Sequence, residues 1–491
     1  MLFPFVFDIV TANVYDCKRY NANFAAPVSA PERGHELAVN AIDKYNLTEG
    51  GIVRKLFSVA APLILTSVFQ MAYNLTDMFW LGRLSSYAVA ATGTVGLFLW
   101  MGMAFLMFGR MGAEIGVSQN FGRGDRARAF DFAQNAIIIS LITGIIIMVV
   151  FFLAQRPLIG IFRIQEENVA QYARDYLAIV SLSAPTSFVS AAIMGVFNGA
   201  GNSRVSLAIG GLGFAINMIL TPILIFSAGL GVIGAAYATV IAHAFGTAFA
   251  LVLLKKFKER PFENFKVFTP VKKSVVKQIF VWVTPISAES FLFTSLTMIV
   301  NILIVSFGAN AMAAARVSSQ VESLTWLIGG GFASAMTAFA GQNYGSRKWT
   351  RITQGFKYSS AIMSLWGLFV SILLIFAGRF LIGLFIHDSP EIVEIGAMNL
   401  RILAIAQIPQ SLEGIAAGVF RGQGKTLPPS ISNVTSNVFR VILAFALVHF
   451  TSLGLNGVWL ALAIGSTFRG IWIYMWYVFY QRKLPKTDGI I

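Results

Sequence analysis

Two short glycine-containing segments, 223 residues apart, indicate that the chain consists of two related halves. Residues 195–203 read Gly-Val-Phe-Asn-Gly-Ala-Gly-Asn-Ser, and residues 418–426 read Gly-Val-Phe-Arg-Gly-Gln-Gly-Lys-Thr. The same offset pairs further residues of types that seldom match by chance in an apolar chain: Pro62 with Pro285, Gln119 with Gln342, Asn120 with Asn343, and Arg156 with Arg379. Similarity at one fixed offset is the signature of an internal duplication. The fold is therefore expected to contain one arrangement twice, with each glycine segment forming a tight turn between two helices.

The composition places both halves in a membrane. Of the 491 residues, 56% are hydrophobic and only 12% are charged, and long apolar runs recur along the chain. A run of about 20 apolar residues is long enough to cross the hydrocarbon core of a bilayer as a helix. This composition excludes a soluble globular domain and favours an all-α polytopic membrane protein.

Twelve transmembrane helices are predicted, six in each half. They cover residues 53–81, 88–113, 129–153, 169–198, 205–228 and 231–254, and then 278–307, 311–340, 352–377, 391–420, 428–451 and 454–480. The domains predicted from these spans are an N-terminal tail (1–50), an N-lobe (51–254), a linker (255–277), a C-lobe (278–480) and a C-terminal tail (481–491). The N-terminal tail lacks the basic start and the cleavage site of a signal peptide. It is interpreted either as a flexible cytoplasmic tail or as the result of a misassigned start codon.

The distribution of basic residues predicts the orientation of the bundle. The side that holds the linker at 255–277 carries 23 Lys and Arg residues near the membrane, and the opposite side carries five. Because Lys and Arg accumulate in cytoplasmic loops, the linker and both termini are predicted to be cytoplasmic. Six spans per half is an even number, so the halves share one orientation and form parallel repeats about an axis along the membrane normal. The net charge of +15 is thereby explained without a nucleic-acid partner.

The sequence contains no pattern that predicts a cofactor or a resident metal. Its single cysteine, Cys17, lies in the predicted tail, and its four histidines are not spaced as metal ligands. Gly424, Lys425 and Thr426 resemble the end of a phosphate-binding loop, but that loop requires glycine where Val419 stands. The spans also lack the nucleophile–base pair that an intramembrane enzyme would need. A transporter is therefore expected rather than an enzyme.

Four polar residues of the first half are predicted to lie at a similar depth. Asp77, the only acidic residue predicted well inside this bundle, is in the first span, Thr239 is in the sixth, and Asn217 and Thr221 share one face of the fifth. At about 1.5 Å per residue they lie roughly 8–17 Å below the outer surface. One carboxylate, one amide oxygen and two hydroxyl groups suit a hard monovalent cation or a carried proton. The alternative is that the Asn and Thr side chains only hold helices together.

The second half carries charges of both signs within its predicted spans. They are Glu289, Arg316, Glu322, Arg401, Glu413, Arg440 and Arg469. Ionisable groups in the hydrocarbon region are costly, so each is a candidate functional residue. Structural salt bridges are one interpretation, and a substrate cavity or second polar site is the other, with Glu289, Glu322, Glu413 and Arg440 as its candidates. Arg440 is the repeat counterpart of Asn217, and Val300 that of Asp77, so the duplicated site has diverged.

Pro62 and Pro285 are repeat counterparts within the first span of each half. Proline inside a helix frees a backbone carbonyl and permits a bend, which neighbouring helices tolerate in a membrane. We predict that bends at these two residues take part in gating.

Several segments resemble the multidrug and toxic compound extrusion (MATE) family, in its prokaryotic DinF-like branch. They are Leu47 to Gly50, Asn74 to Asp77, Gly82 to Leu84, Ser118 to Asp125, Gly341 to Gly345, and the two glycine turns at 195–203 and 418–426. The resemblance extends from residue 46 to about residue 480. It implies a two-lobed antiporter of twelve helices that expels organic cations or other amphiphilic compounds in exchange for Na⁺ or H⁺.

The resemblance also implies roles for individual residues. The coupling site would use Asp77, Asn217 and Thr239. Tyr73 matches a position that lines the same lobe, and with the adjacent Asn74 it is a candidate for the substrate cavity. The DinF-like branch commonly has a second aspartate where this chain has Thr221, so both Na⁺ and H⁺ stay open as the coupling ion.

Two other kinds of transporter are alternatives. A flippase of the same superfamily, acting on a lipid-linked or anionic amphiphile, would favour a basic cavity, for which Arg316, Arg440 and Arg469 are candidates. The major facilitator superfamily also has two parallel six-helix halves, but residues 122–126 lack the second glycine of its loop signature and carry the Asp one place early.

The predicted partners are an amphiphilic or cationic small molecule and the lipid bilayer, with the protein acting as a monomer in the plasma membrane of a prokaryote.

Overall fold

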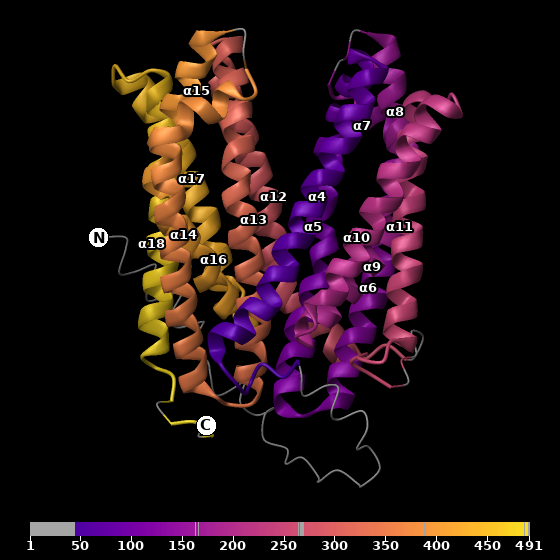
Figure 1. Ribbon diagram of the computed structural model, residues 1–491, viewed down its shortest axis with the longest axis vertical. Coiled ribbons are helices and arrows are strands. Elements are labelled where there is room, and N and C mark those ends of the chain that lie inside the picture. Colours follow the sequence, from indigo (N-terminus) through magenta and orange to yellow (C-terminus); the bar gives the residue numbers. More distant parts are fainter. Residues whose placement is uncertain are drawn as a thin grey trace. The chain divides into compact units, whose positions relative to one another are not determined.

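The described chain is almost entirely helical (Figure 1). The computed structural model describes residues 45–162, 164, 166–263, 265, 270–386, 389–485 and 487–489. Its first half contains α4 (Ile52–Leu84), α5 (Ser86–Arg123), α6 (Arg126–Leu153), α7 (Gln155–Gly160), α8 (Glu167–Ser181), α9 (Ala184–Gly199), α10 (Ser203–Pro222) with the π-turn η1 (Ile223–Ser227), and α11 (Gly231–Lys256). Its second half contains α12 (Lys273–Val305), α13 (Ala309–Gly345), α14 (Trp349–Gly383), α15 (Pro390–Leu403), the 3₁₀ turn η2 (Ala404–Ala406), α16 (Gln407–Gly422), α17 (Leu427–Phe450) and α18 (Leu455–Gln481).

The helices confirm the predicted number of spans. Within the described residues, eleven helices are long and apolar enough to cross a membrane, and the count is twelve if the bent pair α8 and α9 forms one span. That pair bends by 48°, at a break just before Pro185 in the first turn of α9. Its counterpart in the second half, α15 with α16, passes through η2 instead. Each half therefore contributes six crossings, as the duplication requires.

The repeated glycine turns have the same backbone geometry in both halves. Gly201 and Gly424 are repeat counterparts, and their φ angles are +89° and +74°. Only glycine adopts this left-handed region without a steric penalty, which explains why both turns keep it. Residues 118–125 lie between the predicted spans 88–113 and 129–153, but they do not form a loop, because α5 continues to Arg123 and is capped by Gly124, whose φ is +78°.

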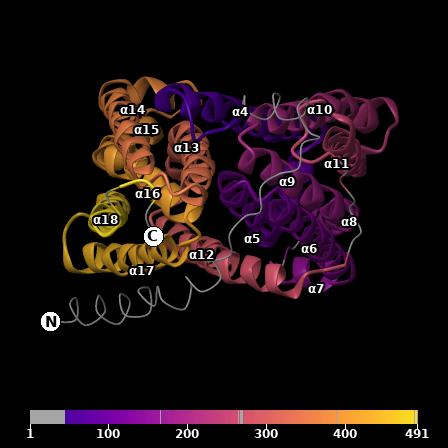
Figure 2. The same cartoon turned by 90° about the horizontal axis from the view of Figure 1, so that it is seen from below.

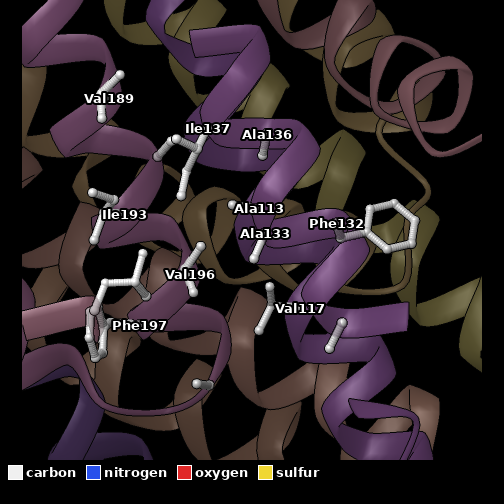
Figure 3. Packing of buried hydrophobic residues seen from close by; sticks show 14 of the residues in the cluster. Ala113, Val117, Phe132, Ala133, Ala136, Ile137, Val189, Ile193, Val196 and Phe197 are labelled. Atoms are coloured by element: carbon white, nitrogen blue, oxygen red, sulfur yellow. The ribbon is translucent and has the colours of Figure 1, made fainter. Parts of the chain in front are cut away.

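The first half is held together by an apolar core, and Figure 3 shows the part of it where α5, α6 and α9 meet. Val117 of α5, Ile137 of α6 and Ile193 of α9 point toward one another and are at most 1% exposed. Ala113 and Ala133 lie between them, also without exposed surface. Small side chains let membrane helices approach closely, and van der Waals contact then stabilises the bundle.

The first helix of each repeat crosses to the other repeat. α4 packs against α10 of its own half and against α13 of the second half, and α12 packs against α17 and against α5 (Figure 2). At the α4–α13 contact, the rings of Phe57 and Phe332 lie 5.2 Å apart edge to face. At the α12–α5 contact, Ser287 Oγ donates a hydrogen bond to the Ala104 carbonyl at 2.7 Å. The predicted lobes at 51–254 and 278–480 thus delimit the repeats in sequence, whereas α4 and α12 each contact both repeats.

Pro62 lies inside α4 and Pro285 inside α12. The two prolines are therefore placed on the crossing helices, near the residues that contact the opposite repeat. Thr66 Oγ1 donates to the Pro62 carbonyl at 2.8 Å. Gating by bends at these residues stays a prediction.

A pair of equivalent hydrogen bonds joins the halves at the end of the bundle that holds the linker, termed here the linker end. Gln119 Nε2 donates to the Gly422 carbonyl at 2.9 Å, and Gln342 Nε2 donates to the Gly199 carbonyl at 2.9 Å. The two donors, Gln119 and Gln342, are repeat counterparts, and so are the two acceptors, Gly199 and Gly422. An interaction that occurs twice with exchanged partners is what a two-fold relation between halves produces. The repeats are therefore parallel, since inverted repeats would place these counterparts at opposite membrane faces.

Two predicted boundaries at the linker end need correction. The chain is already packed before residue 50: Leu47 is 1% exposed, its amide donates to Gln342 Oε1 at 2.9 Å, and Arg351 Nε donates to its carbonyl at 3.1 Å. Residues 1–44, with Cys17, lie outside the described residues. The linker is shorter than predicted, since α11 ends at Lys256 and α12 begins at Lys273, and its residues Phe262 and Phe265 are buried against α5 and α6.

Candidate functional site

Three of the predicted coupling residues lie together where α4 meets α10. Asn217 and Thr221 are one turn apart on α10, and neither has exposed surface. Thr221 Oγ1 donates a hydrogen bond to Asp77 Oδ1 of α4 at 3.2 Å. The Asn217 side chain adjoins the same carboxylate. The i, i+4 spacing therefore correctly placed Asn217 and Thr221 on one face of α10. The packing of α4 against α10 brings the Asp77 carboxylate to that face.

Two aromatic residues and a threonine complete this cluster, which we call the Asp77 cluster (Tyr73, Asp77, Tyr176, Asn217, Thr221, Thr239). Thr239 of α11 is 7% exposed, and its hydroxyl donates to the Ala235 carbonyl at 3.1 Å. Tyr73 precedes Asp77 by one helical turn and adjoins both Thr239 and Asn217. Tyr176 of α8, also 7% exposed, adjoins Asp77 and Thr239. Carboxylate, amide and hydroxyl oxygens from four helices thus surround one point.

Asn217 and Tyr73 carry buried polar atoms that satisfy no hydrogen bond. Among the described residues, both the oxygen and the nitrogen of the Asn217 amide, and the hydroxyl of Tyr73, lack a hydrogen-bond partner. Leaving such atoms unpaired costs about 1–3 kcal/mol each. The amide oxygen and the hydroxyl oxygen are therefore free to coordinate an ion beside the Asp77 carboxylate, and the amide nitrogen is free to donate to a substrate group.

Sequence reasoning missed Tyr176 and His243 as neighbours of this site. The His243 ring lies 6.3 Å from the Tyr73 ring. Tyr176 lies close to the outer end of the predicted span 169–198, as the predicted coupling residues do in their own spans. Its similar depth in the membrane was therefore a signal that could have identified it. Asn74, which was a candidate for the substrate cavity, is exposed, unlike the other members of the predicted set.

Glu114 is a second buried acid in the first half, contrary to the expectation that Asp77 is the only one. It has no exposed surface, and Ser334 Oγ of α13 donates to its Oε1 at 2.8 Å across the two halves. The prediction failed because span 2 was ended at residue 113, whereas α5 continues to Arg123. The stop signals were present further on, as Gly124 caps α5 and Asp125 accepts from the Arg128 amide at the start of α6.

The candidates of the second half separate into paired and unpaired charges. Glu289 of α12 accepts from Ser430 Oγ and from Asn433 Nδ2, each at 2.7 Å, and Arg421 lies 3.5 Å away. Glu413 and Arg469 form a buried ion pair at 2.8 Å. These contacts agree with the structural interpretation of the charges.

Glu322 and Arg440 have weaker partners. Glu322 Oε1 accepts from Gln410 Nε2 at 3.4 Å, and an Arg440 terminal nitrogen donates to Thr297 Oγ1 at 3.4 Å. Arg316 and Arg401, which were also placed within the spans, are exposed. They therefore do not belong to the buried polar region.

The second half has not kept the acidic site. The counterparts of Asp77, Thr221 and Thr239 are Val300, Ala444 and Leu462, and all three belong to one apolar cluster. Among the residues that the structure describes, no three His, Cys, Asp or Glu side chains gather as metal ligands. The Asp77 cluster thus occurs in the first half and has no acidic counterpart at the equivalent positions of the second.

Comparison with known proteins agrees with this architecture. The sequence profile of the MatE family matches residues 62–223 and 285–446, two segments separated by the offset of the duplication. A probable multidrug resistance protein NorM of Thermotoga maritima is 28% identical over 441 residues, which cover 89% of this chain and 94% of that protein. A multidrug export protein MepA of Staphylococcus haemolyticus is 25% identical, over 85% of this chain and 92% of that protein.

Solved structures show the same fold. A multidrug resistance MATE family transporter of the MOP superfamily, in an outward-facing conformation, superposes with a TM-score of 0.84 at 23% identity and covers 90% of this chain and 99% of its own. A MOP superfamily transporter from Pyrococcus furiosus superposes with a TM-score of 0.85 at 23% identity, over 90% and 99% of the two chains. Since the family profile matches both repeats, the chain belongs to the MatE family of membrane transporters.

Proposed function

We propose that this protein is a secondary active antiporter that exports organic cations or other amphiphilic small molecules in exchange for H⁺ or Na⁺. The observation that carries the proposal is the Asp77 cluster, a carboxylate held among buried oxygen atoms inside a membrane helix bundle. An acid in that environment is costly, which makes it a candidate for binding a carried ion. The names of the relatives, a multidrug resistance protein and a multidrug export protein, support the same class of transport.

The crossing of α4 offers a route from ion binding to alternating access. Asp77 lies on the part of α4 that packs against α10, while Phe57 lies on the part that packs against α13. An ion at Asp77 removes a buried charge and changes how α4 packs against α10. Because α4 continues to the opposite repeat, through Pro62, the ion can bias the equilibrium between inward-open and outward-open arrangements. Pro62 and Pro285 act in this scheme as the points at which the crossing helices bend.

The coupling ion is set by the oxygen atoms around Asp77. Thr221 supplies a hydroxyl where the DinF-like branch commonly has a second carboxylate, so the site holds one negative charge. A proton or a single monovalent cation would neutralise that charge. Asn217, Thr221 and Thr239 would supply neutral oxygens, and no cofactor is needed.

A flippase that moves a lipid-linked or anionic amphiphile is the second candidate. The observation that favours it is Arg440, a guanidinium within the second half whose buried Nε has no acceptor among the described residues. A basic cavity suits an anionic headgroup better than an organic cation. The two functions differ in their substrate and in their dependence on an ion gradient.

The experiment that tests the antiport uses purified protein in proteoliposomes loaded with a fluorescent organic cation. We expect export to accelerate at least about tenfold when an inward Na⁺ or H⁺ gradient is imposed, because the gradient drives the outward step. Applying the two gradients separately identifies the ion. Transport that ignores both gradients, with transfer of a labelled anionic lipid in the same vesicles, would favour the flippase instead.

We further propose that the protein is a monomer in the plasma membrane of a prokaryote, with the linker end in the cytoplasm. The exposed basic residues Lys255, Lys256 and Lys258 lie at that end of α11. Attraction of such residues to the cytoplasmic side sets the orientation.

Labelling of single cysteines in a Cys17→Ser background tests this orientation. Lys258→Cys and Ala228→Cys are matched exposed positions beyond opposite ends of α11. An impermeant thiol reagent added to intact cells is expected to modify Ala228→Cys and to spare Lys258→Cys until the cells are opened. The reverse pattern would overturn the proposed orientation.

A further inference from the structure

Residues 45–49, which shortly precede α4, contact both halves at the linker end, and we call them the strap. On the side of the first half, the Tyr45 hydroxyl donates a hydrogen bond to a carboxylate oxygen of Glu259, which follows α11. A Cβ at Gly201, in the turn between α9 and α10, would lie only 2.3 Å from the Tyr45 carbonyl oxygen. Tyr45 therefore lies directly against the first half.

The same strap is bound to the second half through its backbone. Arg351 Nε of α14 donates to the Leu47 carbonyl at 3.1 Å, and Arg351 Nη2 donates to the Glu49 carbonyl at 3.0 Å. Lys348 Nζ donates to the Thr48 carbonyl at 3.0 Å. Charged donors make stronger hydrogen bonds than neutral ones. Two cationic side chains thus hold three consecutive carbonyl groups of the strap.

Gln342 of α13 connects the strap to the contact between the halves. Its Oε1 accepts from the Leu47 amide at 2.9 Å, while its Nε2 donates to the Gly199 carbonyl of the first half at 2.9 Å. Asn343 Nδ2 also donates to the Leu47 carbonyl, at 3.2 Å. Within the described residues, five hydrogen bonds therefore join the strap backbone to side chains of the second half. The first half is reached through Tyr45.

The repeat counterparts of these residues cannot reproduce two of the contacts. Pro270 stands at the position equivalent to Leu47, and it has no amide hydrogen to donate to Gln119. Asp125 stands at the position equivalent to Lys348, and its side chain accepts from the first turn of α6 instead. Of the two equivalent bonds between the halves, the strap therefore reinforces the one made by Gln342.

The contact beside the strap is not fully satisfied by itself. Asn202 follows Gly201 and is 3% exposed. Among the described residues, neither its amide oxygen nor its amide nitrogen has a hydrogen-bond partner. Buried polar atoms without partners destabilise the arrangement that buries them. The halves therefore need a further interaction to stay together at this end.

We propose that the strap holds the linker end closed, moves with the second half, and leaves Glu259 and Gly201 when this end opens. A segment bound to one half by five backbone hydrogen bonds separates from the other half, which it meets through one residue. The start of α4, which follows the strap, also packs against α13 of the second half, where the Phe57 and Phe332 rings lie 5.2 Å apart. The inference rests on the proposed alternating access, and it does not depend on which ion drives transport.

Spin labels on the strap and on each half test which half the strap follows. Glu49→Cys, Ala127→Cys of α6 and Lys357→Cys of α14 are exposed positions, and they are combined in pairs in the full-length protein with Cys17→Ser. The 127–357 distance reports whether the linker end is open. In open molecules we expect the 49–127 distance to lengthen and the 49–357 distance to stay unchanged.

Tyr45→Phe removes the hydroxyl that binds Glu259 and keeps the ring. We expect it to raise the ratio of open to closed molecules about fivefold or more, because a hydrogen bond to a charged group is lost. Tyr237→Phe is the control, since Tyr237 is an exposed tyrosine at the start of α11, away from the linker end. It should leave all three distances unchanged.

A variant at the other attachment tests whether the strap joins the halves. Lys348→Gln together with Arg351→Gln removes the two cations that hold the strap carbonyls, and it should also open the linker end. Adding Tyr45→Phe to it should have little further effect, because a strap released from one half no longer joins the two. Arg128→Gln, at the exposed repeat counterpart of Arg351, should leave the distances unchanged.

The outcomes distinguish the strap from the proposed antiport. Unchanged distances in Tyr45→Phe overturn the strap, and this variant decides alone if the one at 348 and 351 folds poorly. A 49–357 distance that lengthens on opening, or fully additive effects of the two attachments, overturns it as well. If the strap variants open the linker end but export ignores Na⁺ and H⁺ gradients, the strap stands and the antiport is wrong.

Discussion

Asp77→Asn is expected to abolish ion-driven export from proteoliposomes while the protein stays folded and inserted. Asparagine has nearly the same shape as aspartate, so the contact with Thr221 at 3.2 Å can be kept. The variant nevertheless has no charge for a proton or a monovalent cation to neutralise. Binding would then no longer bias the two arrangements of the transporter. Efflux under an imposed Na⁺ or pH gradient should fall to the rate of vesicles without protein.

Matched variants make this expectation specific. Asp175→Asn removes an acid of α8 that is held by Gln171 of the same helix at 2.8 Å, and it should transport at the wild-type rate. Thr221→Asp adds a second carboxylate beside Asp77 and should strengthen binding of the coupling ion. If Asp77→Asn transports normally while Glu289→Gln or Glu413→Gln does not, the coupling site lies in the second half.

Alanine at Gly122 or Gly345 is expected to prevent the linker end from closing. A Cβ at Gly122 would lie 1.8 Å from the Gln342 carbonyl oxygen, and a Cβ at Gly345 would lie 1.9 Å from that of Gln119. These are backbone atoms of the opposite half, so they cannot move aside as a flexible side chain could. Overpacking typically costs about 1–3 kcal/mol, which is enough to shift a two-state equilibrium about fivefold or more. The halves should separate at this end, and transport should be lost.

Distances between spin labels measure the separation directly. Labels at Ala127→Cys of α6 and Lys357→Cys of α14, both exposed and in different halves, report on the linker end in a Cys17→Ser background. Gly122→Ala and Gly345→Ala should each shift the distances upward. The control pair is Gly160→Ala and Gly383→Ala, repeat counterparts whose added Cβ would meet nothing within 4 Å. Unchanged distances in both test variants would show that this contact does not hold the closed state.

The number and order of the helices were determined by local properties of the sequence. A membrane helix must satisfy its own backbone hydrogen bonds, so each long apolar run specifies one crossing without reference to its neighbours. The duplication was equally visible, since a match such as Pro62 with Pro285 needs no knowledge of contacts. The i, i+4 spacing of Asn217 and Thr221 placed both on one face for the same reason.

Contacts between helices were decided only by the tertiary structure. The hydropathy of the spans could not show that α4 and α12 also pack against the opposite repeat. An apolar helix face can pack equally well against a helix of its own repeat or of the other one. Helix ends beyond the apolar run were also missed, which hid Glu114 within α5. Nor could the sequence separate Glu413, which pairs with Arg469 at 2.8 Å, from Glu322, which has only Gln410 at 3.4 Å. The sequence alone shows that a charge in a membrane span has a desolvation cost. Whether an ion pair offsets that cost depends on which helix packs against the charged residue.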